Sequence, residues 1–158
     1  MEKPIIQVNH LVAKFDQEII LDNITFEVKP GEIFIILGFS GCGKTTLLNH
    51  MVGLLTPTSG EILIEGENIV TAYGDQRQAL LQKIGVTYQS GALFGSMTLL
   101  ENVRLPLEEA TDLPLEAMNC IAQEKLELVG LDHFADYMPS EISGGMQKRA
   151  GIARAMAL

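Results

Sequence analysis

The chain has 158 residues, of which 20 are acidic and 11 basic, so its formal net charge is -9. This length is typical of one domain or of part of a larger protein, and a hydrophobic content of 47% is enough for a packed core. The acidic balance excludes a general nucleic-acid binder, because such a protein needs surplus Lys and Arg to neutralise phosphates.

The first residues lack the basic and then apolar pattern of a signal peptide. Two cysteines, Cys42 and Cys120, are too few for a disulfide scaffold and fit a reducing compartment. No stretch reaches the ~18 consecutive apolar residues that a membrane-spanning helix needs. We therefore expect a cytoplasmic protein.

The N-terminal half alternates β-rich segments with turn residues. Strands are predicted at residues 5–8, 19–21, 24–28, 61–65 and 84–88, with turns at 22–23, 29–31 and 66–68. Residues 32–37 form a continuous apolar run, which predicts a strand buried on both faces of a parallel or mixed sheet. Helices are predicted at residues 44–55 and 76–82.

The C-terminal half is mostly helical by pattern. Helices are predicted at residues 97–107 and 115–129, the second with Pro114 in its first turn and Gly130 as its C-terminal cap. Residues 101–141 hold ten acidic and two basic side chains, which indicates an acidic helical insertion or, alternatively, only a solvated face. A last helix runs from Met146 to Leu158 with no Gly or Pro stop, so we expect a truncated chain.

The run Gly38-Phe-Ser-Gly-Cys-Gly-Lys44-Thr45 matches the phosphate-loop motif in full, between a predicted strand and a predicted helix. Its glycines let backbone N–H groups curl around phosphates, and the helix N-terminus favours anions. Lys44 is expected to reach the β- and γ-phosphates and Thr45 to ligate Mg²⁺. The candidate ATP-binding residues here are Gly38, Phe39, Ser40, Gly41, Cys42, Gly43, Lys44, Thr45 and Thr46.

This motif alone does not separate kinases, GTPases and transport ATPases, and a Gly-rich turn without a ligand is the simpler alternative. Cys42 lies inside the loop, beside a helix start and Lys44, so we expect a reactive thiol whose alkylation blocks nucleotide binding. For the mechanism itself, any small residue would fit that position and the thiol needs no role.

The segment Ser140-Glu-Ile-Ser143-Gly144-Gly145-Met146-Gln-Lys-Arg is a Ser-Gly-Gly turn that opens a helix, with Ser143 as a good N-cap. By itself it would be an ordinary capped helix. Together with the phosphate loop and with Gln89 after a predicted strand, it resembles the ATP-binding cassette ATPases over essentially the whole chain.

The resemblance implies roles for further residues. Gln89 matches the glutamine that contacts Mg²⁺ or the attacking water, and it joins Lys44 as a candidate catalytic residue. Ser143, Gly144 and Gly145 match the signature that contacts the γ-phosphate of ATP bound to a partner subunit. Phe15 matches the aromatic residue that stacks on adenine; its alternative is a strand residue packed in the core.

Two departures from the family pattern matter. Met146 stands where the signature usually has Gln. Together with the segment from Gln89 to Phe94, Met97, Asn102-Val103 and Pro106-Leu107, the Ser-Gly-Gly-Met run resembles the Mla-type lipid-transport subgroup, also called the toluene-tolerance family. The family's later Asp-Glu strand and its His have no counterpart before Leu158, since His10, His50 and His133 lie elsewhere. We therefore expect this chain to bind nucleotide at most and to be inactive in hydrolysis.

The resemblance implies an α/β fold: an incomplete P-loop NTPase (RecA-like) core with an N-terminal antiparallel β subdomain and a helical signature subdomain. The expected subdomains are 1–37 with 60–70 (β-rich), 38–59 with 71–90 (core), 91–145 (helical) and 146–158 (signature helix). The implied protein is a homodimeric ATPase on the cytoplasmic face of the inner membrane. It uses ATP and Mg²⁺, works with integral membrane permease subunits and has no nucleic-acid partner. The surface around Gln89 and the following segment, residues 90–107, would receive the permease.

Four alternatives to a complete lipid-transport ATPase are open. A small-molecule kinase would share the phosphate loop but leaves Gln89 and the Ser143 turn unexplained. A cassette protein of translation or DNA repair fits the acidic balance poorly. The ATPase of another importer or exporter shares every class-level motif. A module that binds nucleotide without hydrolysing it is the favoured interpretation of the chain as given.

Overall fold

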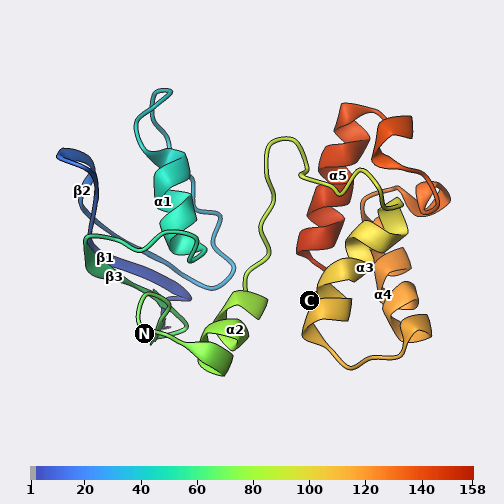
Figure 1. The fold of residues 1–158 in the computed structure, drawn as a ribbon, viewed down its shortest axis with the longest axis horizontal. Coiled ribbons are helices and arrows are strands. Elements are labelled where there is room, and N and C mark those ends of the chain that lie inside the picture. Colours follow the sequence, from blue (N-terminus) through green and yellow to red (C-terminus); the bar gives the residue numbers. More distant parts are fainter. Residues whose placement is uncertain (1–2) are drawn as a thin grey trace. The chain divides into compact units, whose positions relative to one another are not determined.

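The computed structural model describes residues 3–158, which form two compact units (Figure 1). The first, called the β unit here, extends to Leu81, and the second, the helical unit, is Gln82–Leu158.

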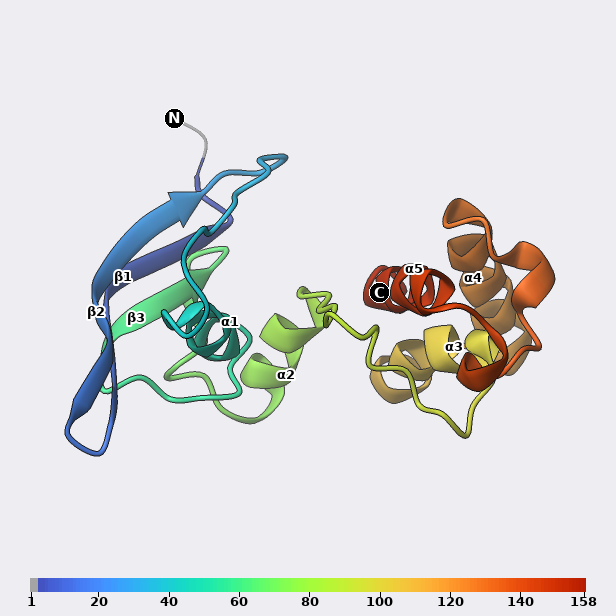
Figure 2. The ribbon, with the colours of Figure 1, turned by 90° about the horizontal axis from the view of Figure 1, so that it is seen from above.

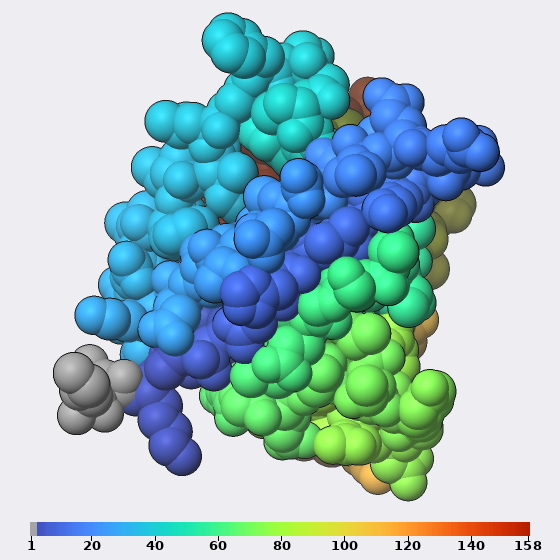
Figure 3. Space-filling view, turned by 90° about the vertical axis from the view of Figure 1, so that its left-hand side faces the viewer, coloured from blue at the N-terminus to red at the C-terminus, as the bar shows by residue number. Residues whose placement is uncertain are grey.

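The β unit is built on a four-stranded antiparallel sheet with the strand order β2-β1-β3-β4. Its strands are β1 (Ile6–Phe15), β2 (Glu18–Val28), β3 (Ser59–Ile64) and β4 (Glu67–Asn68). Figure 3 shows the three long strands side by side on one face of this unit. Glu65 and Gly66 connect β3 to β4, and both have positive φ, as a type I′ hairpin turn requires.

Two helices, α1 (Lys44–Met51) and α2 (Gly74–Gln82), lie on the same side of this sheet (Figure 2). The core of the unit consists of alternate residues of the strands with one face of each helix, because successive strand residues point to opposite faces. Its buried members include Val8, Leu11, Ala13, Leu21, Ile62, Ile64, Leu47 and Leu80.

The predicted buried strand at residues 32–37 is wrong for this structure. The segment has no regular structure, and Ile33 and Leu37 are 89% and 86% exposed. The predicted strand at residues 84–88 is also irregular. Within residues 3–158 neither segment has a paired neighbour, and an apolar run becomes a sheet strand only when adjacent strands satisfy its backbone N–H and C=O groups.

Smaller differences concern the ends of elements. Helix α1 ends at Met51 rather than at residue 55. The turn predicted at residues 22–23 lies inside the continuous strand β2, where Asn23 has a left-handed φ of 52°. This residue makes an irregularity in the ladder rather than a reversal, because β1 pairs with β2 on both sides of it.

The helical unit consists of three helices, α3 (Leu99–Ala110), α4 (Leu115–Leu128) and α5 (Gly144–Ala155), with short 3₁₀ turns at Asp132–Phe134 and Pro139–Glu141. The predicted helices are confirmed to within a few residues. Most acidic side chains of residues 101–141 are exposed. The core contains Leu99, Val103, Leu107, Met118, Ala122, Leu126, Leu131, Ala150, Ala153 and Ala157.

Capping residues determine where these helices begin and end. Thr98 and Glu101 form a capping box, so α3 begins at Leu99 and not at residue 97 as expected. Hydrogen bonds from the backbone N–H and side chain of Thr98 hold the pKa of the Glu101 carboxyl below its ordinary value. Gly130 follows α4 with a positive φ of 67°, as predicted for its cap. Among the described residues, no helix has both the length and the apolar character to cross a membrane.

Candidate functional site

The phosphate-loop motif forms a tight turn ahead of α1. Gly43 is the N-cap residue of the helix, with a φ of 91°, and Gly41 has a φ of 83°. Non-glycine residues rarely adopt these angles, so the loop geometry requires both glycines. No side chain caps α1, and no acidic residue lies in its first turn. The positive end of the helix is therefore available to an anion.

Lys44 folds back over the loop. Its Nζ donates hydrogen bonds to the carbonyl oxygens of Gly38 (2.7 Å) and Phe39 (2.6 Å) and lies 3.5 Å from Cys42 Sγ. The ammonium group is thus held at the same loop as the uncapped helix start. This combination of a cation and free backbone donors is the donor set that a polyphosphate prefers.

The sheet fixes the end of the loop. A Cβ atom on Gly43 would lie 2.9 Å from Leu21 Cδ2 and 3.2 Å from the Ile20 carbonyl oxygen, so β2 packs directly on the loop backbone. At the other end, a Cβ on Gly38 would lie 2.4 Å from Cys42 Sγ. The exposed thiol of Cys42 therefore occupies the space beside Gly38.

Phe15 ends β1 in the same unit and is 50% exposed. This exposure contradicts the alternative that Phe15 is packed in the core. Its ring is accessible to a planar ligand, while its stacking role stays a prediction.

Gln89 lies in the helical unit, in the irregular segment between α2 and α3. It is exposed and lines a shallow groove of about 310 Å³ with Thr87, Tyr88, Lys148 and Ile152. Two of these residues belong to α5. The structure therefore brings Gln89 beside the helix that the Ser-Gly-Gly turn begins, which the sequence alone did not indicate.

Ser143 caps α5 as expected, because its Oγ accepts a hydrogen bond from the backbone N–H of Met146 at 3.3 Å. Gly144 and Gly145 follow it and are exposed. A Cβ on Gly144 would meet nothing within 4 Å, and its φ is not in the left-handed region. The fold itself does not require glycine there, so the bare backbone suits close approach by another molecule.

Two side chains hold the segment after Gln89, and the sequence pattern did not predict this role for either of them. Arg154 of α5 bonds to the backbone of Gly91 and Ala92, and the fully buried Asn102 of α3 bonds to Phe94, Met97 and Thr98. The capping-box pattern Thr98-Leu-Leu-Glu101 was a sequence signal that places Asn102 in the first turn of α3. No local pattern pointed to Arg154.

Comparison with known proteins adds a family match. The family described as ABC transporter matches residues 21–158. The phospholipid-transport ATP-binding protein MlaF of Haemophilus influenzae is 43% identical over the whole chain, which spans 60% of that protein. A probable ribonucleotide transport ATP-binding protein, mkl of Mycobacterium leprae, is 42% identical over 97% of the chain, which spans 44% of that protein.

A solved structure with the same fold is the dimeric ATP-binding cassette MJ0796 in a post-hydrolysis state with ADP and Pi bound. It matches 96% of this chain with a TM-score of 0.86 and 34% identity, and the match covers 69% of that protein's chain. The expected α/β cassette fold is thereby confirmed.

Proposed function

Because the chain belongs to the ABC transporter family, we propose that it is the ATP-binding part of a transporter ATPase whose phosphate loop, residues 38–46, holds the phosphates of ATP. The observation that carries this proposal is the uncapped start of α1 with Lys44 Nζ held at the same loop. A kinase would explain this loop equally well but not the open glycine turn after Ser143.

The remaining site residues take the roles that the family pattern gives them. Thr45, exposed in the first turn of α1, would ligate the Mg²⁺ that offsets phosphate charge. Gln89 keeps the role that the family pattern gives it, a contact to Mg²⁺ or to the attacking water. Phe15 would stack on adenine. Ser143, Gly144 and Gly145 would contact the γ-phosphate of ATP bound by a second copy, and the bare backbone at Gly144 supports this.

We further propose a homodimer on the cytoplasmic face of the inner membrane, attached to integral membrane permease subunits. Phospholipid is the proposed cargo, supported by the likeness to MlaF. The likeness to mkl supports ribonucleotide instead. ATP-dependent phospholipid transfer by the assembled transporter, measured beside ribonucleotide uptake, separates the two.

The proposal predicts that the 158-residue chain binds ATP and that Lys44→Met weakens binding. Removal of a charged donor to phosphate costs about 1.5–3 kcal/mol, or about 10–100-fold in Kd. Isothermal titration with ATP measures both values. Lys14→Met, which removes an exposed lysine of the same unit, is the control and should keep the wild-type Kd. Absence of ATP binding by the wild-type chain would contradict the proposal.

Alkylation of Cys42 should block ATP binding, because the adduct would occupy the loop beside Gly38 and Lys44. N-ethylmaleimide treatment followed by ATP titration tests this. The exposed Cys120 on α4 provides the control. A Cys120→Ala chain should remain sensitive and a Cys42→Ala chain should become resistant. Retained ATP binding after stoichiometric modification of Cys42 would refute the expectation.

A further inference from the structure

The segment that carries Gln89, residues 83–98, contains no helix or strand. Its position in the helical unit therefore depends on side chains that reach it from the helices. We propose that Arg154 is a positioning residue that fastens the backbone just after Gln89 to α5, so that Gln89 and the Ser143 turn move as one body. The fastening of the segment by Arg154 is argued from contacts within the helical unit. Any effect of this contact on ATP rests on the proposed function.

The contact is a fork around two consecutive peptide carbonyls. Arg154 Nη1 donates to the Ala92 carbonyl oxygen at 2.9 Å, and Nη2 donates to that of Gly91 at 3.2 Å. The guanidinium carbon lies 5.9 Å from the centre of the Phe94 ring, within cation–π range. A planar guanidinium can serve two acceptors in a fixed geometry, whereas a lysine ammonium is a single point charge.

The backbone to which Arg154 donates its hydrogen bonds has an unusual conformation. Gly91 and Ala92 have φ values of 78° and 47°, and the left-handed region is unfavourable for alanine. Hydrogen bonds to both carbonyls favour this conformation over the extended alternatives. Loss of the guanidinium should therefore release Ala92 first.

The same stripe of α5 packs directly on the segment. Gln147, Gly151 and Arg154 are spaced four and three residues apart and so share one helix face. A Cβ on Gly151 would lie 2.9 Å from Gly91 Cα, and one on Gly91 would lie 2.5 Å from the Gln147 carbonyl oxygen. Backbone meets backbone at this point, so small displacements of α5 are transmitted to the segment without an intervening flexible side chain.

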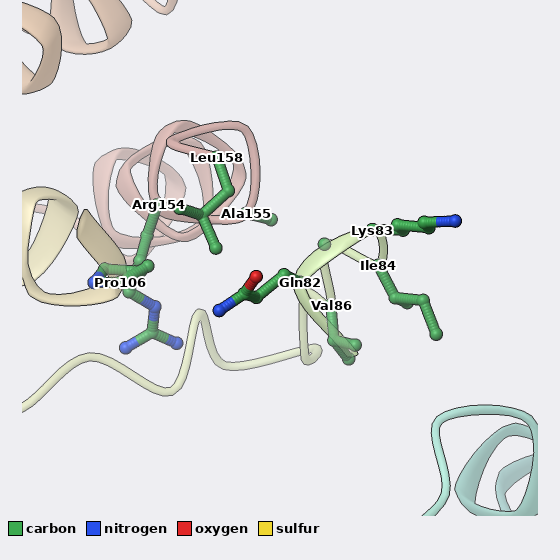
Figure 4. A pocket seen from close by; sticks show the side chains of 9 residues that line it. Gln82, Lys83, Ile84, Val86, Pro106, Arg154, Ala155 and Leu158 are labelled. Carbon is green, nitrogen blue, oxygen red and sulfur yellow. The ribbon is translucent and has the colours of Figure 1, made fainter. Parts of the chain in front are cut away.

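Packing alone does not hold the Arg154 side chain. It lines a pocket of about 250 Å³. Figure 4 shows Arg154 there with other residues that line the pocket, among them Gln82, Ile84, Val86, Pro106, Ala155 and Leu158. Partial burial removes part of the hydration of the guanidinium and so lowers its pKa below the ordinary value. Its carbonyl partners replace that hydration, and they are also what keeps the guanidinium in place.

The test is amide hydrogen exchange of the 158-residue chain, with Arg154→Met compared with wild type. The Gly91 N–H bonds to the Tyr88 carbonyl oxygen at 2.8 Å, so its exchange rate reports opening of this segment. We expect exchange at Gly91 and Phe94 to rise about tenfold or more, while amides of α4 keep their rates.

Two further variants separate positioning from general stability. Arg149→Met is the matched control, because Arg149 on the same helix bonds to the consecutive carbonyls of Val129 and Gly130. It should loosen residues 129–131 and leave Gly91 unchanged. Arg154→Lys keeps the charge and most of the reach but lacks the two-pronged guanidinium, so it should fail to restore protection at Gly91. If Arg154→Met does not fold, the lysine variant is compared with wild type instead.

Unchanged exchange at Gly91 in both Arg154 variants would overturn the proposal, as would full rescue by lysine. Exchange in the presence of MgATP is a separate measurement on wild type. If ATP binds, it should slow exchange at Gly91, and Arg154→Met should reduce that effect. Absence of ATP binding would count against the proposed function alone, because the nucleotide-free comparison already decides whether Arg154 fastens the segment.

Discussion

Gly60→Ala is expected to destabilise the β unit by about 3 kcal/mol. Gly60 in β3 has a φ of 92°, where an L side chain adds ~1–2 kcal/mol of strain. A Cβ there would also lie 2.5 Å from the His10 carbonyl oxygen and 2.7 Å from that of Asn9. Overpacking of this kind adds ~1–3 kcal/mol, because the obstructing atoms are backbone and not the flexible end of a side chain.

The obstructed backbone cannot easily move away. Residues 9–12 of β1 form an irregularity in the pairing with both β2 and β3, and His10 itself has a φ of 50°. The His10 N–H donates to Thr25 Oγ1 at 2.9 Å, and its Nδ1 lies 2.8 Å from Asn23 Oδ1. Gly60 therefore faces a part of β1 that β2 already holds from the other side.

Thermal unfolding followed by circular dichroism measures this effect, with hydrogen exchange assigning the transition to β1 and β3. A domain of this size loses ~4–8 °C per kcal/mol, so the midpoint should fall by more than ~10 °C. Gly66→Ala is the matched control, since Gly66 has a φ of 87° but nothing within 4 Å of its Cβ position. Its loss should be limited to ~1–2 kcal/mol of backbone strain, without the steric contribution. Equal effects of the two substitutions would contradict the steric argument.

Asn102→Ala is expected to destabilise the helical unit by about 3–4 kcal/mol. The side chain is fully buried. Its Oδ1 accepts from the Phe94 N–H at 2.7 Å, and its Nδ2 donates to the carbonyl oxygens of Phe94, Met97 and Thr98 at 2.9–3.1 Å. Truncation removes all four hydrogen bonds, unpairs backbone groups and leaves a small cavity.

Urea denaturation measures the change, with Asn119→Ala as the control. Asn119 on α4 is half-buried and accepts one hydrogen bond, from Arg104 Nη1 at 2.7 Å, so its loss should cost about 1 kcal/mol. Asn102→Asp is a second variant of nearly the same shape. It should be at least as harmful as alanine near neutral pH, because a carboxylate would face three carbonyl oxygens. A neutral effect of Asn102→Ala would show that the loop does not depend on this side chain.

The sequence was most reliable where local chemistry is sufficient. The glycines and Lys44 of the phosphate loop define its turn and its charge. Ser143 and Gly130 mark helix ends because they satisfy backbone groups within the same turn. The apolar spacing of residues 115–129 placed α4 to within one residue, since one helix face must be buried.

The failures have a common cause. The run 32–37 was interpreted as a buried strand from its composition, yet a strand depends on neighbours that lie far away in sequence. Residues 84–88 are irregular for the same reason. Asn23 is of a residue type that favours turns, but it lies inside β2 because pairing with β1 continues on both sides of it.

The sequence by itself therefore determined the family pattern, the phosphate loop and the helix caps, all of which depend on residues a few positions apart. Only the tertiary structure decided that Gly60 must be glycine, that Asn102 holds the loop before α3 and that Arg154 reaches the backbone 62 and 63 positions earlier in the chain. These contacts arise from the packing of elements against one another. A single sequence records the side chains involved but does not record which distant backbone they will meet.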